Sequence, residues 1–275
     1  PLRCSQSPPN VPLATQSRFE LAASVPRQQG SMQYVGGKQK SGGAQIAQAI
    51  NAMIKALGLR SYCEPFCGGL SVTQRIVAPE RRASDACAAL ICLYQRLQGG
   101  WVPPLSLSKE EWLELKAAND PSNPLTAFAG FGCSFLGKWF TSYTPKFKRT
   151  NKYVHSALAA TESLSNKMAK CQAVTFSSGD YRTLGAGDLI YCDPPYEGTV
   201  GYSAVGAFDS GSFWEWAREQ SRTTLLAVSE QQAPADFTPL RTFSLQSRIA
   251  TGTGNRRTEH LYVHASQLEK WQVAC

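Results

Sequence analysis

Apolar positions along the chain follow two periods. Apolar residues recur at helical spacing over 44–57, from about Ser71, from Asp85 to about Leu97, and over 211–221. Shorter segments with the character of strands lie at 61–64, 82–84, 173–177, 188–192, 224–229 and 260–264. Strands that alternate with helices are typical of α/β proteins. The pattern therefore predicts a doubly wound α/β sheet.

This alternation is interrupted after Gly99-Gly100, and residues 103–171 are predicted to form an insert. Ser108 and Glu111 have the spacing of a capping box, which predicts a helix start. No acidic residue lies between Pro121 and Thr161. Five basic residues lie there among aromatic ones: Lys138, Lys146, Lys148, Arg149 and Lys152.

Residues 1–31 carry five prolines, few large apolar residues and one acid. This composition predicts a flexible N-terminal arm. A second interpretation stays open, in which the segment is foreign to the natural chain and the natural start is Met32.

Composition limits the class of protein. Apolar residues make up 43% of the chain, enough for a sizeable core, and no stretch is apolar enough to predict a membrane span. The net charge of +8 permits a nucleic-acid partner without establishing one. Nine cysteines are an odd number, and several lie in apolar runs, which favours reduced thiols in the cytoplasm over a disulfide framework. Cys63 and Cys67 have no matching pair downstream, so no metal site is expected.

The most specific local feature is Asp193-Pro194-Pro195-Tyr196, directly after the apolar run 189–192. Two prolines cannot continue a central strand and predict a rigid corner at its carboxyl end, the side on which α/β sheets bind ligands. Asp193 and the carbonyl of Pro194 can accept hydrogen bonds from an amine on a planar ring, and Tyr196 can stack on that ring. The alternative is a rigid turn with a capping aspartate.

A second feature is Glu64-Pro65-Phe66-Cys67-Gly68-Gly69, where a strand runs into a glycine turn. This arrangement is typical of loops that hold a nucleotide-like cofactor. Asp85 follows at the next strand end, where a carboxylate commonly accepts from ribose hydroxyls. Helix caps are the alternative for both segments. In a third feature, Tyr34-Val35-Gly36-Gly37-Lys38, the glycines permit close approach to a ligand and Lys38 can meet a carboxylate; a solvated turn is the alternative.

Together these segments resemble the Dam-like DNA adenine methyltransferases, in the form found in phages and prophages. The order of cofactor loop, insert and tetrapeptide is similar to the α group of that family. The similar segments, within residues 32–265, are Tyr34–Lys38, Glu64–Gly69, Asp85, Phe131–Phe140, Ser178–Tyr181 and Asp193–Tyr196.

The resemblance implies a Rossmann-like mixed sheet with a mainly helical target-recognition insert. It divides the chain into a cofactor-binding part of the catalytic domain (32–102), the insert (103–171) and a second catalytic part (172–275). It implies catalytic roles for Asp193, Pro194 and Tyr196. It implies S-adenosylmethionine as cofactor, held by Tyr34, Gly36, Gly37, Lys38, Glu64, Phe66, Gly68, Asp85, Asp180, Tyr181 and Asp193.

The implied reaction is methyl transfer to N6 of an adenine flipped out of duplex DNA. The basic insert residues, with Arg256 and Arg257, are expected to contact DNA phosphates; an ordinary solvated face is the alternative. Two other functions stay open: methylation of cytosine N4 or an RNA base, and a non-catalytic DNA-binding homologue. We further expect a monomer, without membrane or metal partners, in the cytoplasm of a bacterial or phage-infected cell.

Overall fold

The computed structural model describes residues 42–149, 152–185, 187–195, 208–246 and 256–272. The predicted N-terminal arm, the segment Tyr34–Lys38 and Tyr196 lie outside this part of the chain. For Arg149, Arg256 and Arg257 the backbone is described but the side chains are not.

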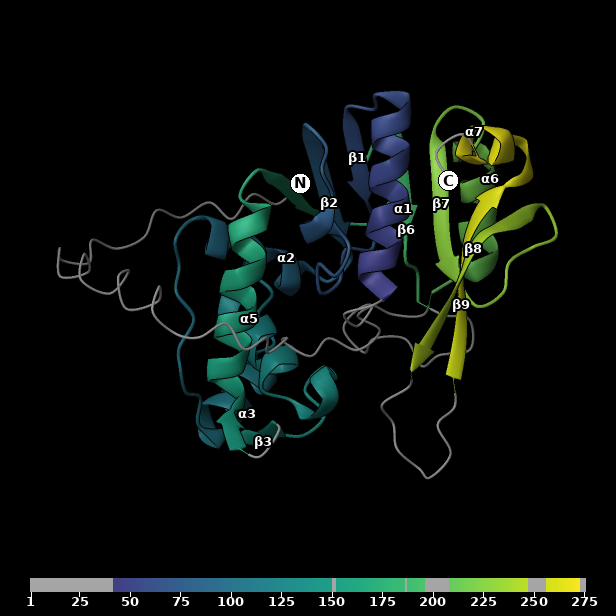
Figure 1. The fold of residues 1–275 in the computed structure, drawn as a ribbon. Helices are drawn as coiled ribbons and strands as arrows, with labels where there is room; N and C mark the ends of the chain where they lie inside the picture. The colour runs from purple at the N-terminus through teal and green to yellow at the C-terminus, as the bar shows by residue number, and fades with distance from the viewer. Residues whose placement is uncertain (1–41, 150–151, 186, 196–207, 247–255, 273–275) are drawn as a thin grey trace.

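A seven-stranded mixed sheet forms the centre of the molecule (Figure 1). In spatial order its strands are β5 (Val174–Ser178), β2 (Glu80–Asp85), β1 (Ser61–Glu64), β6 (Leu189–Cys192), β7 (Leu225–Glu230), β9 (Arg256–His264) and β8 (Phe237–Gln246). The first five are mutually parallel, and β9 is antiparallel to both of its neighbours. The chain winds outward from β1 to β2 and β5, then returns to β6 on the other side, so the switch point lies between β1 and β6. The predicted doubly wound mixed sheet is confirmed.

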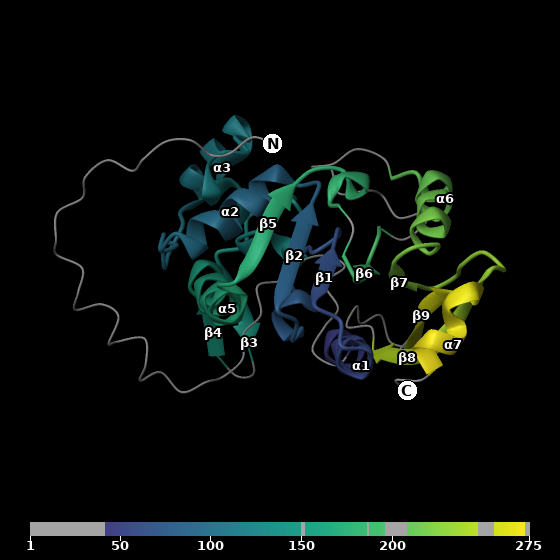
Figure 2. The ribbon, with the colours of Figure 1, turned by 90° about the horizontal axis from the view of Figure 1, so that it is seen from above.

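Helices cover both faces of this sheet (Figure 2). On one face lie α1 (Gly42–Leu57), α5 (Ser156–Cys171) and the short α7 (Leu268–Gln272), and on the other lies α6 (Ser210–Gln220). The helix α2 (Ala88–Gln98) covers the open edge of β5, where Gln95 and Gln98 donate to the carbonyls of Phe176 and Val174 at 2.9 and 2.8 Å. These bonds satisfy edge groups that would otherwise be unpaired.

The insert contains α3 (Lys109–Ala118), α4 (Pro124–Ala127) and a hairpin of β3 (Lys146–Arg149) with β4 (Lys152–His155). The predicted capping box is confirmed: Glu111 N donates to Ser108 Oγ at 3.1 Å, and Ser108 N donates to Glu111 Oε2 at 2.7 Å. One apolar cluster runs without a break from the sheet into the insert. Its members include Phe176 of β5, Leu164 of α5, and Trp112, Phe128 and Phe131 of the insert.

The structure differs from the sequence pattern in three places. The helix predicted after Ser71 is wrong: only a 3-10 turn, η2 (Thr73–Arg75), forms, because Leu70 has a left-handed backbone and Pro79 ends the available segment. The pattern also missed β8 and the β3–β4 hairpin. In β8, Pro239 lies beside a register shift at the sheet edge, a position where proline is tolerated.

The seven described cysteines are buried free thiols, which confirms the expectation of reduced cysteines for this part of the chain. Among the described helices, none has the length and apolar character needed to cross a bilayer.

Candidate active site

Three predicted site carboxyls lie at the carboxyl ends of neighbouring strands. Glu64 ends β1, Asp85 ends β2, and Asp193 directly follows β6. Glu64 is paired with Ala83 on one side, and Cys63 with Ile190 on the other. If the register is continued, Asp85 and Asp193 flank the end of β1, two strand spacings or about 10 Å apart. The sheet thus brings these sequence-distant groups to one edge.

The loop after β1 is tied to Asp85 through backbone N–H groups. Gly68 N donates to Asp85 Oδ2 at 3.0 Å, and Cys87 N donates to Oδ1 at 2.9 Å. Burial raises the pKa of the Asp85 carboxyl, and these two N–H groups oppose that shift. A carboxylate oxygen has two lone pairs, so Asp85 can still accept from the hydroxyls of a ligand.

Side chains from two helices hold the carbonyls of the same loop. Tyr94 OH of α2 donates to the carbonyl of Gly68 at 2.6 Å, and Lys167 Nζ of α5 donates to that of Gly69 at 2.6 Å. Arg75 donates to the carbonyl of Ser71. The loop needs these donors because no α-helix follows it. Sequence reasoning missed all three residues.

Glu64 is a buried carboxyl with 2% of its surface exposed. Its Oε2 accepts from Tyr62 OH at 2.7 Å and from Thr73 Oγ1 at 2.6 Å. Burial raises the pKa of Glu64 to about 8, against the effect of these two hydroxyls, and the charge of Asp193 raises it further. Glu64 is therefore largely uncharged at neutral pH, and Asp193 is close enough for its charge to act on the Glu64 carboxyl.

Rings gather beside the loop. Phe66 stacks on Tyr181 with 5.4 Å between centroids, and Phe208 and Phe213 pack edge-on against Phe66 at 5.8 and 5.7 Å. Asp180 caps the 3-10 turn η5 (Tyr181–Thr183) and pairs with Arg182 at 2.7 Å. The side chain of Tyr181 therefore belongs to the aromatic cluster, while Asp180 is exposed.

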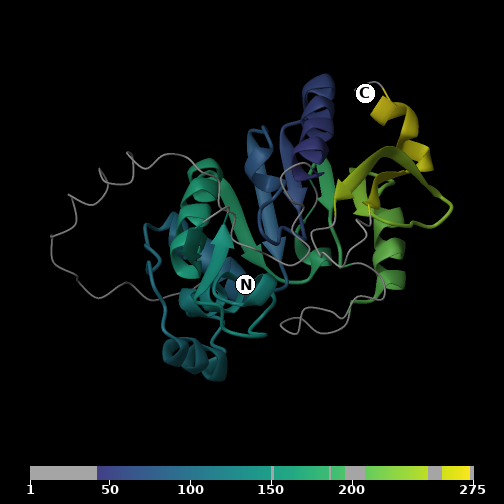
Figure 3. The ribbon, with the colours of Figure 1, turned by 60° about the horizontal axis from the view of Figure 1, so that its bottom comes forward.

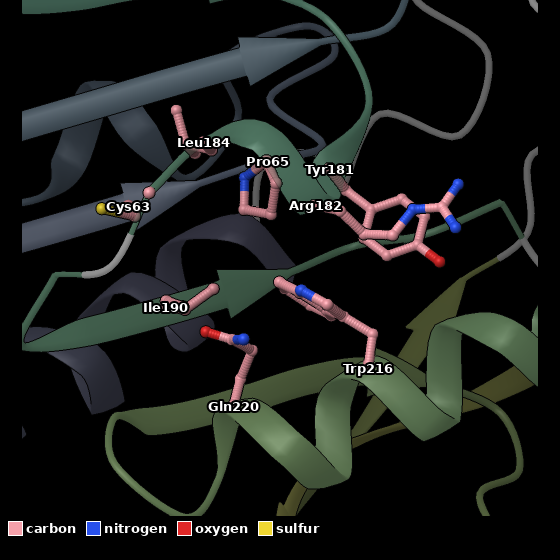
Figure 4. A pocket seen from close by; sticks show the side chains of 9 residues that line it. Cys63, Pro65, Tyr181, Arg182, Leu184, Ile190, Trp216 and Gln220 are labelled. Atoms are coloured by element: carbon pink, nitrogen blue, oxygen red, sulfur yellow. The ribbon is translucent and has the colours of Figure 1, made fainter.

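A cavity of about 250 Å³ opens between η5 and α6 (Figure 4). Tyr181, Arg182 and Trp216 line it from the two sides, and Cys63 and Ile190 form its floor on the sheet. Gly68, Asp85 and Asp193 are not among the residues that line it. It is thus adjacent to the glycine loop without including the carboxyls at the strand ends.

The model of the family described as "D12 class N6 adenine-specific DNA methyltransferase" matches residues 34–111. This match contains the glycine loop, Asp85 and the segment Tyr34–Lys38, and it ends inside α3. The matched segment is less than half of the chain, and it is similar to this class of adenine-specific methyltransferases.

Solved structures that are similar to this chain include the following three. The rRNA methyltransferase AviRa from Streptomyces viridochromogenes is 14% identical, with 80% of this chain and 84% of that chain covered and a TM-score of 0.36. A putative RNA methyltransferase from Pyrococcus horikoshii is 10% identical, with coverages of 90% and 97% and a TM-score of 0.40. A putative methylase from Haemophilus influenzae is 11% identical, with coverages of 81% and 98% and a TM-score of 0.30. Similarity at this level says nothing about the substrate.

The predicted basic residues whose side chains are described are all exposed: Lys138, Lys146, Lys148 and Lys152. Lys148 is paired with Tyr153 across the hairpin, and Lys146 with His155, so these two pairs share one face of the hairpin. Figure 1 and Figure 3 show the insert at one end of the sheet and the β8–β9 ribbon at the other, both reaching past the edge toward which β1 and β7 point. Arg256 and Arg257 begin β9 at the far end of that ribbon.

The described part of the chain holds no group of three or more His, Cys, Asp or Glu side chains arranged to bind a metal ion.

Proposed function

We propose that the chain transfers the methyl group of S-adenosylmethionine to N6 of an adenine flipped out of duplex DNA. The observation that carries this proposal is the position of Asp193 at the switch-point edge, beside Glu64 and within reach of the loop that Asp85 holds. Ligands of doubly wound sheets bind at this edge. A carboxyl that can accept from an amine and a glycine loop that can hold a cofactor thus lie at one edge of the sheet, which supports the proposal.

The residues at this edge fit the cofactor. Asp85 offers free lone pairs to ribose hydroxyls, and the left-handed backbone of Gly68, with a φ of 39°, permits close approach. Glu64 supplies a buried carboxyl for a cation such as the cofactor's ammonium. Phe66 and Tyr181 offer an apolar surface for a purine ring. When bound, S-adenosylmethionine supplies a methyl group activated by its sulfonium.

Asp193 and Pro194 orient the acceptor amine. Both carry oxygen atoms that can accept from an exocyclic –NH₂ group, and this draws the amine toward a tetrahedral geometry that frees its lone pair. Asp193 does not have to be a strong base, because a methylated amine loses its proton readily. Positioning of the two reactants supplies much of the rate gain. Tyr196 is assigned to stacking on the base, and Tyr34, Gly36, Gly37 and Lys38 to the cofactor's methionine end.

Duplex DNA fits the edge as a whole. The N6 amine of adenine cannot be reached inside the stack, so the base must be extruded. The insert and the β8–β9 ribbon flank the edge, and the exposed lysines of the hairpin suit phosphate contacts.

The other two functions differ from this proposal in the base that is methylated, or in the absence of any reaction. Cytosine N4 and RNA-base methylation use the same amine chemistry, and the adenine-specific family match favours adenine. A non-catalytic homologue would not require Asp193, Glu64 and Asp85 to remain at one edge.

The test is methyl transfer from labelled S-adenosylmethionine to duplex DNA of mixed sequence, followed by analysis of the nucleosides. We expect N6-methyladenine. Labelled N4-methylcytosine, or label found only when RNA replaces DNA, would support the second function. Cofactor binding without transfer to any of these acids would contradict an enzymatic role. The variant Asp120→Ala, in an exposed turn of the insert, serves as the control for preparation and folding.

A further inference from the structure

Lys167 is a buried lysine with 8% of its surface exposed, on the side of α5 that faces the glycine loop. Its Nζ donates to the carbonyl of Gly69 at 2.6 Å, across 98 residues of sequence. Lysine is almost never this buried unless a partner offsets the loss of hydration. The contact therefore links the last part of the insert to the loop that receives the cofactor.

Burial of the ammonium group is unfavourable. Burial and, to a smaller extent, the charge of Arg75 in η2 lower the pKa of Lys167 to about 8, against the effect of Cys171 one turn along α5. An apolar side chain of similar length would avoid this cost in a core position. A residue that violates a local packing rule is expected at a functional site.

The backbone that Lys167 holds is strained. Leu70, directly after Gly69, has a φ of 58°, a conformation that is unfavourable for a branched side chain. Such a conformation persists only where surrounding contacts over-determine it. Leu70 N donates to the carbonyl of Cys67 at 2.8 Å, and Lys167 holds the other side of the same peptide group. The Gly69–Leu70 peptide is thus fixed at both its N–H and its carbonyl.

The preceding peptide, Gly68–Gly69, is held at its carbonyl. Tyr94 holds the carbonyl of Gly68, so the N–H of Gly69 points in the opposite direction, since the peptide group is planar and trans. Lys167 and Tyr94 together determine which backbone groups of Gly68 and Gly69 face the strand ends.

We propose that Lys167 is a positioning residue through which α5 holds the glycine loop in the conformation that receives S-adenosylmethionine. This inference rests on the proposed function, because it assigns the loop to the cofactor. It adds a residue outside all of the predicted site segments, and it places the cofactor loop under the control of the helix that follows the insert's hairpin.

The first test is Lys167→Met, with Lys170→Met as the matched control one turn away on the exposed side of α5. Loss of one hydrogen bond from a charged donor should weaken binding of S-adenosylhomocysteine, measured by calorimetry, about tenfold. KM for S-adenosylmethionine should rise by the same factor, while kcat at saturating cofactor changes little. Lys170→Met should match the wild type in each measurement.

A purely structural role would lower the melting temperature of Lys167→Met and leave the affinity of the folded protein equal to that of Lys170→Met. That result would overturn the proposal. If the wild type binds no S-adenosylhomocysteine, the proposed function itself is refuted, and the assignment of Lys167 with it.

A second variant decides the question even if Lys167→Met fails to fold. Lys167→Arg keeps a donor and stays charged at high pH, whereas the wild-type lysine loses its proton above pH 8. The affinity of the arginine variant for S-adenosylhomocysteine, relative to wild type, should therefore rise between pH 7 and pH 9.5. The titration of Glu64 is common to both proteins and cancels in this ratio. Parallel pH profiles would overturn the proposal.

Discussion

At the scale of single residues, the arrangement of the strands brings the carboxyls of Glu64 and Asp193 close together. Each is the polar residue that ends a buried strand, and the parallel register brings the two together. Their proximity raises the pKa of Glu64 beyond what burial alone would do. The charge of Asp193 at this edge favours a ligand that carries positive charge, which agrees with a sulfonium cofactor.

The raised pKa of Glu64 predicts how stability depends on pH. The unfolded side chain ionises near pH 4.5, whereas the folded one ionises at about pH 8. Between these values the folded state binds more protons, so the free energy of unfolding falls as the pH rises. Glu64→Gln removes this loss. Its melting temperature relative to wild type should therefore increase from pH 5 to pH 8.5, as measured by circular dichroism.

The control for that prediction is Glu269→Gln, at an exposed position of α7. Its melting temperature should follow the wild type at both values. A Glu64→Gln protein whose difference from wild type is the same at pH 5 and pH 8.5 would mean that Glu64 is already ionised at neutral pH.

Asp193→Ala tests the catalytic assignment. The variant removes a hydrogen-bond acceptor for the amine and leaves the basic surfaces unchanged, so DNA binding should be retained and methylation abolished. Gel-shift and methyl-transfer assays on one preparation measure the two properties. Substantial residual turnover would refute the role of Asp193.

The sequence was informative about residues that end strands, and less so about residues that support them. Glu64, Asp85 and Asp193 could be located because each lies at the end of a segment that the sequence predicts as a strand. Tyr94 and Lys167 could not, because their partners are backbone carbonyls of a distant loop. One signal was present: Lys167 interrupts the apolar side of a helix that also carries Leu164, Met168 and Cys171.

At the level of elements, the β3–β4 hairpin places charge where DNA is proposed to lie. Tyr153 is 73% exposed on the face that also carries Lys146 and Lys148. α5 begins at Ser156, directly after β4, and continues for 16 residues, or about 24 Å, to the sheet. The hairpin is thus carried by a helix anchored in the core.

Replacement of Lys146 and Lys148 by Gln should weaken DNA binding with little dependence on base sequence. If each lysine neutralises one phosphate, the slope of log K against log salt should fall by about 2. Fluorescence anisotropy over a range of salt concentrations measures it. The double variant Lys55→Gln, Lys270→Gln removes the same charge from α1 and α7. An equal fall in that control would show that net charge, and not the hairpin, determines the slope.

The helices of the catalytic part were easier to predict from the sequence than the hairpin of the insert. α1 and α6 carry regular apolar patterns and were predicted nearly to their ends. The hairpin was missed because lysines occupy both of its faces, Lys146 and Lys148 on one and Lys152 on the other, and so mask the alternation of apolar and polar residues. The prediction of a helix from about Ser71 was wrong. The carbonyls of this loop accept hydrogen bonds from Tyr94, Lys167 and Arg75, and not from the N–H groups of a helix.

For the whole molecule, the continuous core makes the insert part of the catalytic body. Phe128 is fully buried between α2, the insert and the sheet-side helices, in the same cluster as Phe176 of β5. The predicted boundary at 103–171 separates segments of sequence, and it remains a prediction about function. The packing indicates that sheet and insert unfold together.

Phe128→Ala tests this cooperativity. Truncation of a buried phenylalanine should lower the free energy of unfolding by about 3–5 kcal/mol. Because the cluster is continuous, urea transitions followed by far-ultraviolet circular dichroism and by tryptophan fluorescence should shift together and remain coincident. Phe135→Ala in the same insert is the matched control, since Phe135 is 53% exposed and its loss should leave both transitions in place. If the fluorescence transition, which includes Trp112 and Trp139, shifts alone while the dichroism transition stays, the insert is an independent folding unit. The glycine loop would then sit between two bodies instead of inside one.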